Sequence, residues 1–154
     1  MSLDARTIEK LAKVGLTVMQ PDAHAPSSTV PLFIAKVAAG MPSPADDYVE
    51  KTLDLNEYCL PNSEASFFLK VSGNSMTGAA IHDGDILVVD RSIKPQSGQV
   101  VIAMLDGEMT VKRLLRKDGK VLLQPDNPDY PTITVSPDQD FSVMGTVTFV
   151  VHKA

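Results

Sequence analysis

Ser75 is the residue whose surroundings most suggest covalent chemistry. It lies in the segment SGNSM, where a strand-like run over residues 67–71 stops at a glycine-containing turn. A serine hydroxyl becomes an effective nucleophile when a neighbouring base takes its proton. The identity of that base therefore decides what kind of site Ser75 belongs to.

Histidine and cysteine residues allow two alternative kinds of catalytic site. The chain has three histidines and one cysteine: His24, His82, His152 and Cys59. His82 and Asp83 could form a triad with Ser75, but three side chains must then converge across a turn whose geometry the sequence does not predict. A Cys59/His82 pair is weaker still, because a single cysteine is more often a small buried hydrophobic residue. The cysteine and histidine spacing predicts no metal site, and we expect no cofactor.

A lysine is the other candidate for the base. A lysine in water titrates near about 10.4, so it acts as a base at neutral pH only when burial lowers its pKa. Lys70 directly precedes the turn, and Lys94 lies in a polar loop. Lys112, in EMTVKRLL, is different because it lies within an apolar, strand-like run.

The Asp106-Gly107 pair predicts the orientation of Lys112. Asp-Gly between two apolar runs is a strong signal for a hairpin with a two-residue loop. That loop pairs Lys112 with Val101 and Arg113 with Val100, which puts the two cations on opposite faces of the sheet. The pattern alone does not say which cation points inward, and both could reach water from a sheet edge.

The elements around these residues indicate an all-β fold of short, bent strands. The expected strands cover residues 67–71, 86–90, 100–105, 109–115, 121–124, 132–135 and 143–151. Residues 4–14 predict a short helix whose apolar stripe is too thin for stability on its own. Three prolines interrupt residues 16–36, which predicts an extended N-terminal arm.

Composition narrows the class of protein. The 154 residues suit one domain, with 44% apolar residues and no apolar run long enough to cross a membrane. The N-terminus lacks the pattern of a signal peptide, and the single cysteine favours a cytoplasmic location. Residues 1–39 carry a net charge of +1 and the remainder −6. An acidic body disfavours direct binding to DNA phosphates.

Four segments together resemble the self-cleaving UmuD and LexA family of SOS-response proteins: SGNSM, HDGDILVVD, GQVVIAMLDGEMTVKRL and LLQPDNPDYPTITV. The resemblance covers roughly residues 31–152, and Lys112 follows Ser75 at the spacing typical of the UmuD branch. It implies a compact β domain like those of LexA and signal peptidase. By the same resemblance, Ser75 is the nucleophile, Lys112 is the general base, and the backbones of Ser75 and Met76 bind the oxyanion.

The resemblance also implies a cleavage site. Family members cut their own chain after a small residue that glycine follows, and KVAAGMPSP contains Ala39-Gly40. Without a Ser/Lys pair, Ala39-Gly40 would equally suit a flexible linker. We therefore expect residues 1–39 to be an arm removed by self-cleavage, and residues 40–154 to be the catalytic and dimerisation domain. The short region before the cut leaves no room for the DNA-binding domain of LexA and favours the UmuD branch.

Partners are implied by the resemblance alone. They are a second copy of the chain in a homodimer, a RecA filament on single-stranded DNA that activates cleavage, and a UmuC-type polymerase subunit for translesion synthesis. Two alternatives remain. One is a non-enzymatic β dimer that binds polymerase or RecA. The other is a Ser/Lys peptidase that acts in trans, such as a signal peptidase, which usually needs a membrane anchor.

Overall fold

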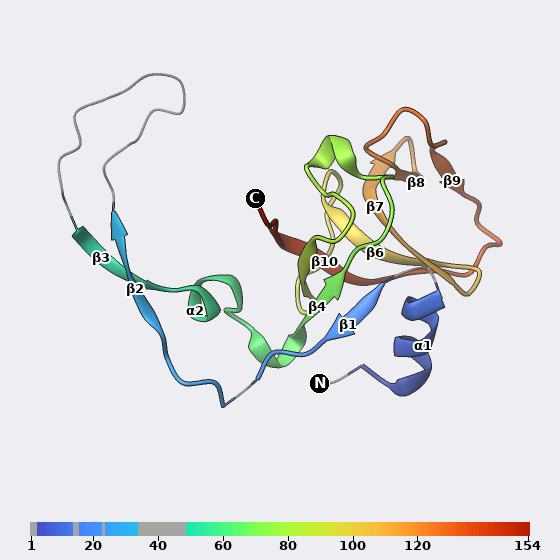
Figure 1. Ribbon diagram of the computed structural model, residues 1–154. Helices are drawn as coiled ribbons and strands as arrows, with labels where there is room; N and C mark the ends of the chain where they lie inside the picture. The colour runs from blue at the N-terminus through green and yellow to red at the C-terminus, as the bar shows by residue number, and fades with distance from the viewer. Residues whose placement is uncertain (1–2, 14–15, 23, 34–48) are drawn as a thin grey trace, which may run out of the picture. The chain divides into compact units, whose positions relative to one another are not determined.

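The computed structural model describes residues 3–13, 16–22, 24–33 and 49–154 (Figure 1). The chain divides into two compact units, one formed by residues 1–23 and 62–154 and the other by residues 24–61. Within the described residues, none of the helices is both long and apolar enough to cross a bilayer. The expected boundary between Ala39 and Gly40 lies outside the described residues, so that division remains a prediction.

The larger unit is built on an eight-stranded antiparallel sheet, which confirms the predicted β fold. The strand order is β1-β4-β5-β10-β6-β7-β8-β9. In that order the strands are β1 (Thr17–Met19), β4 (Ser66–Lys70), β5 (Ile86–Asp90), β10 (Phe141–Val151), β6 (Val100–Leu105), β7 (Glu108–Lys117), β8 (Lys120–Gln124) and β9 (Ile133–Val135). Two short 3-10 helices, η1 (Ser63–Ala65) and η2 (Thr77–Ala79), flank β4 and the turn that follows it.

Two Asp-Gly loops set the register of the central strands. All four of their residues, at 106–107 and 118–119, have positive φ angles between 49° and 81°. This conformation is that of the type I′ turn, whose twist matches that of the flanking strands. The first loop pairs Lys112 with Val101 and Arg113 with Val100, as predicted. Adjacent residues of β7 therefore point to opposite faces of the sheet.

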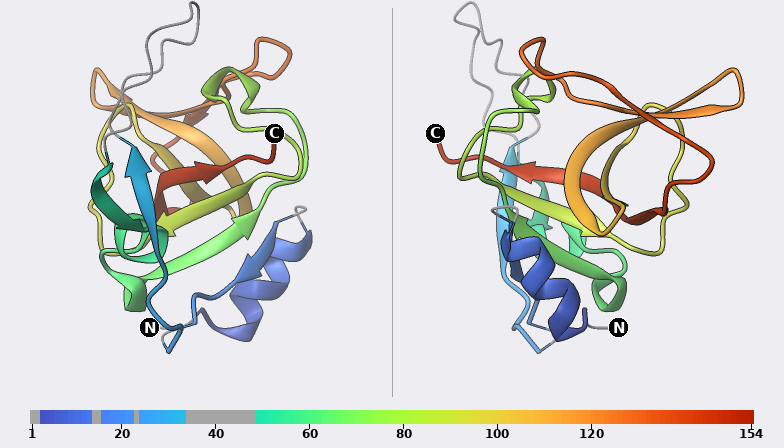
Figure 2. Two further views of the ribbon diagram at one scale, coloured as in Figure 1. Left: turned by 60° about the vertical axis from the view of Figure 1, so that its left-hand side comes forward. Right: turned by 90° about the vertical axis from the view of Figure 1, so that its right-hand side faces the viewer.

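The sheet curls, so that β7 and β8 bend away from β4 and β5 (Figure 2). Strand β10 runs between the two halves and shifts register near Gly145 against β6. A Cβ atom on Gly145 would lie 2.5 Å from Val89 Cγ1, so only glycine permits this close approach. One buried cluster covers the β4–β5 side of the unit, and a second, formed by Val101, Ala103, Leu114 and Leu123, fills the curl.

The first part of the chain is integrated into this unit. Helix α1 (Ala5–Lys13) begins after Asp4, whose side chain accepts the Thr7 N–H at 2.8 Å. Leu11 is only 1% exposed and joins the core that contains Leu69, and β1 pairs with β4. Packing therefore stabilises a helix that its own composition would leave marginal.

The smaller unit consists of β2 (Thr29–Phe33), β3 (Val49–Asp54) and α2 (Leu55–Cys59), with β2 and β3 antiparallel. Asp54 caps α2, because its side chain accepts the N–H groups of Asn56 and Glu57 at 2.8 and 3.3 Å. The same carboxylate accepts the Ser28 N–H at 2.9 Å, which ties the start of β2 to the end of β3. The predicted arm is thus extended over residues 29–33, where it forms a strand.

Candidate active site

Ser75 lies in a loop that follows β4 and is held at both ends. Gly73 has a φ of 101°, and its N–H donates to Asp83 Oδ1 at 2.9 Å. On the other side, Asn127 Nδ2 donates to the carbonyl oxygen of Asn74 at 2.7 Å. These contacts come from distant parts of the chain and fix the loop that presents the serine hydroxyl.

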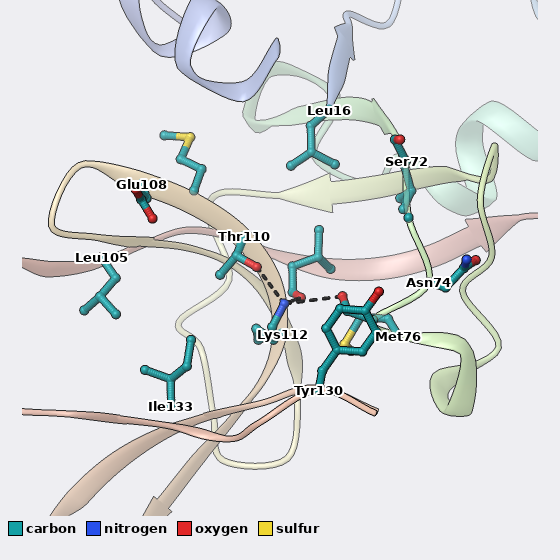
Figure 3. A pocket seen from close by; sticks show the side chains of 15 residues that line it. Leu16, Ser72, Asn74, Met76, Leu105, Glu108, Thr110, Lys112, Tyr130 and Ile133 are labelled. Carbon is teal, nitrogen blue, oxygen red and sulfur yellow. Dashed lines mark hydrogen bonds between the residues drawn. The ribbon is translucent and has the colours of Figure 1, made fainter. Parts of the chain in front are cut away.

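Lys112 points from β7 toward that hydroxyl (Figure 3). Its Nζ lies 3.3 Å from Ser75 Oγ, 2.7 Å from Thr110 Oγ1 and 3.0 Å from the carbonyl oxygen of Val111. Lys112 is 8% exposed, and burial lowers the pKa of its amine below the usual value near 10.5. A neutral amine at this distance can accept the proton of the serine hydroxyl.

Arg113 has a different environment from its neighbour. Its guanidinium forms a bidentate ion pair with Asp126 and donates from Nη1 to the Gly98 carbonyl oxygen at 2.6 Å. The Asp126 hydrogen bond raises the pKa of Arg113 further, so this side chain stays charged. The structure thus resolves the choice left by the hairpin pattern: Lys112 faces Ser75, and Arg113 does not reach it.

Met76 anchors the loop through its side chain. The side chain is buried, and its Sδ accepts the Asp126 N–H at 3.4 Å. The Gly78 N–H donates to the Asp126 carbonyl oxygen at 2.6 Å, and a Cβ on Gly78 would lie 2.5 Å from that oxygen. The expected oxyanion role belongs to the backbone N–H groups of Ser75 and Met76, and it stays a prediction.

A pocket of about 430 Å³ opens around Ser75 and Lys112. Apolar side chains from several elements line most of it, including Leu16, Leu105, Met109 and Ile133, together with Tyr130 (Figure 3). A largely apolar pocket suits an apolar peptide segment better than a charged one. Ala39 and Gly40, the expected cleavage site, lie outside the described residues.

The alternative bases are engaged elsewhere. His82 contacts Asp85 and lies beside His152, and Asp83 holds Gly73. Cys59 belongs to α2 of the smaller unit, where burial raises the pKa of its thiol and so disfavours the nucleophilic thiolate. Within the described residues, the side chain that the structure places against the Ser75 hydroxyl is Lys112.

Sequence reasoning missed some residues of the pocket. Thr110 contacts the lysine amine, Asn127 fixes the serine loop, and Tyr130 and Leu16 line the pocket. Thr110 could have been found, because it lies two residues before Lys112 and so shares its face of the strand. Asn127 and Tyr130 lie in the segment LLQPDNPDYPTITV, but their contacts depend on long-range folding.

The fold and site together describe a β protein in which a loop serine meets a buried lysine. The peptidase S24-like family matches residues 31–148. Protein SamA of Salmonella typhimurium is 44% identical over 138 residues, which cover 90% of this chain and 96% of SamA. Protein ImpA of Escherichia coli is 48% identical over 125 residues, which cover 80% and 83% of the two chains. A LexA repressor of Paracidovorax citrulli is 44% identical over 121 residues, 79% of this chain and 54% of the repressor.

The chain therefore belongs to the peptidase S24-like family, a family of serine peptidases. SamA and ImpA are UmuD-like proteins, and with the LexA repressor they relate the chain to the SOS-related, self-cleaving members of that family. The resemblance predicted from the four sequence segments is thus confirmed.

Proposed function

We propose that this protein is a serine endopeptidase that cuts its own Ala39-Gly40 bond with Ser75 as the nucleophile and Lys112 as the general base. The observation that carries the proposal is the 3.3 Å approach of Lys112 Nζ to Ser75 Oγ, in a pocket where burial lowers the pKa of the amine. Membership of the peptidase S24-like family supports it.

The chemistry proceeds in two stages. Neutral Lys112 takes the Ser75 proton as Oγ attacks the Ala39 carbonyl carbon, and the N–H groups of Ser75 and Met76 stabilise the oxyanion. The resulting ammonium, held by Thr110 and the Val111 carbonyl, returns its proton to the nitrogen of Gly40 as the peptide bond breaks. Lys112, neutral again, then takes a proton from water as the water oxygen attacks the acyl-Ser75 ester. It returns that proton to Ser75 Oγ as the ester bond breaks, which leaves Ala39 with a free carboxylate.

The proposal includes a biological switch. Because the substrate belongs to the same chain or to the same dimer, its effective concentration is high and docking of the cleavage segment limits the rate. We infer that a RecA filament on single-stranded DNA promotes that docking. The shortened homodimer then serves as the accessory subunit of a UmuC-type, error-prone translesion polymerase. The UmuD-like relatives support this part of the proposal.

Mass spectrometry of the purified chain tests the enzymatic part. With a RecA filament on single-stranded DNA, the chain should yield two fragments, residues 1–39 and 40–154. Ser75→Ala and Lys112→Ala should each abolish cleavage, and the double variant should be no worse than either single one. Ser72→Ala is the matched control, because Ser72 lines the same pocket but is not the serine that contacts Lys112.

Two results would contradict the proposal. One is a chain that stays intact under every condition, which would favour the non-enzymatic accessory dimer. The other is cleavage that persists in the Lys112→Ala variant at an unchanged rate, which would remove the lysine from the mechanism.

A further inference from the structure

A cluster of two histidines and one aspartate lies at one end of the β5–β10 ladder. Asp85 immediately precedes β5, and His152 immediately follows β10. The last pair of this ladder is Val151 with Ile86. The next residue beyond the end of β10 is His152, and it therefore lies opposite Asp85, the residue just before β5. His82 lies on the turn before β5 and reaches the same carboxylate. Three side chains with metal-binding atoms thus converge.

The cluster brings the possible ligand atoms of its three side chains close together. Asp85 Oδ1 lies 2.6 Å from His152 Nδ1, and Asp85 Oδ2 lies 3.7 Å from His82 Nδ1. The two imidazole rings are 5.3 Å apart between centroids, and one ligand atom from each of the three residues lies within 4.8 Å of the others. Ligands of a tetrahedral Zn²⁺ are about 3.3 Å apart, so metal binding would replace the 2.6 Å hydrogen bond between Asp85 and His152 and move these two atoms apart.

Burial and charge in the cluster also suit a cation. The Asp85 side chain is 3% exposed, whereas those of His82 and His152 are 49% and 57% exposed. The Asp85 carboxylate accepts the His82 N–H at 2.8 Å through Oδ2 and contacts His152 Nδ1 through Oδ1, so it lies against both histidines. The exposed side of the rings leaves room for water as a further ligand.

We propose that His82, Asp85 and His152 bind a divalent transition-metal ion, with Zn²⁺ as the best-suited ion. Two imidazole nitrogens, one carboxylate oxygen and a water make up a ligand set that Zn²⁺ commonly accepts. Mg²⁺ and Ca²⁺ prefer sites made entirely of oxygen, so the two imidazoles select against them. Among the described residues, this is the one group of three such side chains that converges in this way.

The site adjoins the support of the Ser75 loop. The turn over residues 82–85 holds that loop through three contacts: Gly73 N–H to Asp83 Oδ1 at 2.9 Å, Gly84 N–H to the Val71 carbonyl at 2.8 Å, and Val71 N–H to the Asp85 carbonyl at 2.8 Å. A metal ion would cross-link this turn to the end of β10. Binding would therefore stabilise the folded unit and restrict the segment that positions the serine.

Titration of the full-length, untagged chain with ZnCl₂ tests the site, after a chelator has removed bound metal. Calorimetry should detect one equivalent of Zn²⁺, and MgCl₂ should produce no saturable binding. CoCl₂ should give the visible absorption of four-coordinate cobalt. At a free Zn²⁺ concentration about one hundredfold above the dissociation constant, the melting temperature should rise by roughly 5–10 °C.

Histidine variants decide whether these residues are the ligands. His82→Ala and His152→Ala should each abolish the stoichiometric binding and the cobalt spectrum; both side chains are half exposed, so both variants should fold. His24→Ala, which changes a histidine of the smaller unit, is the matched control and should bind as the unmodified chain does. Absence of saturable Zn²⁺ binding, or binding that survives His152→Ala, would overturn the proposal.

Discussion

Lys112 can act as a base only in its neutral form, and its surroundings favour that form. Burial lowers the pKa of the amine below about 10.5, and the structure gives no carboxylate partner to Nζ within the described residues. The lowered pKa of Lys112 also affects stability. In the unfolded chain Lys112 keeps its proton to higher pH than in the folded chain, so the free energy of unfolding rises with pH between the folded and unfolded pKa values of Lys112.

The rate of self-cleavage should therefore increase with pH. As the pH rises toward the lowered pKa of Lys112, a larger fraction of the chains carries a neutral amine that can accept the Ser75 proton. The measurement is the initial rate of appearance of residues 40–154 by mass spectrometry from pH 7 to pH 10. Circular dichroism at each pH provides the control for folding. A rate that is flat over this range would argue against a lysine base.

Replacement of the two adjacent cations should separate catalysis from stability. Arg113→Ala leaves Asp126 without its ion pair, which should lower the free energy of unfolding by about 1–3 kcal/mol while most of the cleavage remains. Lys112→Ala should abolish cleavage with little effect on stability. Removal of the buried amine also removes the free-energy cost of its desolvation, and this gain offsets the cost of the cavity that the substitution leaves.

Urea denaturation in a Ser75→Ala background measures the two stabilities without interference from cleavage, and the single variants report the activity. An inactive Arg113→Ala variant together with an active Lys112→Ala variant would reverse the roles that the hairpin register gives to these residues.

At the scale of elements, helix α1 depends on one buried contact. Leu11 is 1% exposed, whereas Ile8 on the same helix is 36% exposed. Leu11→Ala should lower the free energy of unfolding by about 2–4 kcal/mol, because it leaves a cavity in the core around Leu69. Ile8→Ala, the matched control, should cost less than about 1 kcal/mol. Chemical denaturation checks both values, and equal losses would mean that α1 does not pack as described.

The first 22 residues should remain bound after cleavage at Ala39-Gly40. Leu3, Leu11 and Leu16 are buried in the larger unit, and β1 pairs with β4 through three residue pairs. These contacts do not depend on an intact bond further along the chain. Gel filtration of the cleaved protein in native buffer should show both fragments eluting together, and Leu11→Ala should promote their separation. Immediate separation of the unmodified fragments would contradict this expectation.

At the scale of the whole molecule, release of residues 1–39 should act as the switch: cleavage at Ala39-Gly40 permits it, and it is complete only when the contacts of α1 and β1 with the larger unit break. A shortened chain that begins at Gly40 keeps the other strands of the sheet and should still fold. Because it lacks α1 and β1, it should expose the apolar surface of β4 that Leu11 and Leu16 cover. Gly40→Glu should block cleavage, because burial of an unpaired carboxylate in an apolar pocket costs several kcal/mol as an order of magnitude.

Complementation of a strain that lacks its own homologue compares these two forms. Only the shortened chain that begins at Gly40 should restore damage-induced mutagenesis, and the Gly40→Glu chain should not, provided that both accumulate to equal levels. Equal mutagenesis from the two forms would mean that cleavage is not the switch, even if the peptidase chemistry proved correct.

Local sequence was sufficient where a feature depends on neighbours along the chain. The Asp-Gly loops at 106–107 and 118–119 require positive φ at consecutive residues, and their two-residue length determines the pairing of β6 with β7 and of β7 with β8. The opposite orientations of Lys112 and Arg113 follow from that pairing and from the two-residue period of a strand. The candidates Ser75 and Lys112 were also recognisable from their motifs.

Tertiary structure decided which residues meet across the chain. Lys112 faces Ser75 because the sheet curls and Asn127 holds the serine loop, and a periodic pattern contains no information about either contact. Packing of Leu11 converts a marginal helix into part of the core. His152 reaches Asp85, 67 positions earlier, only because β5 and β10 pair up to their ends. Such contacts depend on the burial and pairing of distant segments, so no local window of the sequence can specify them.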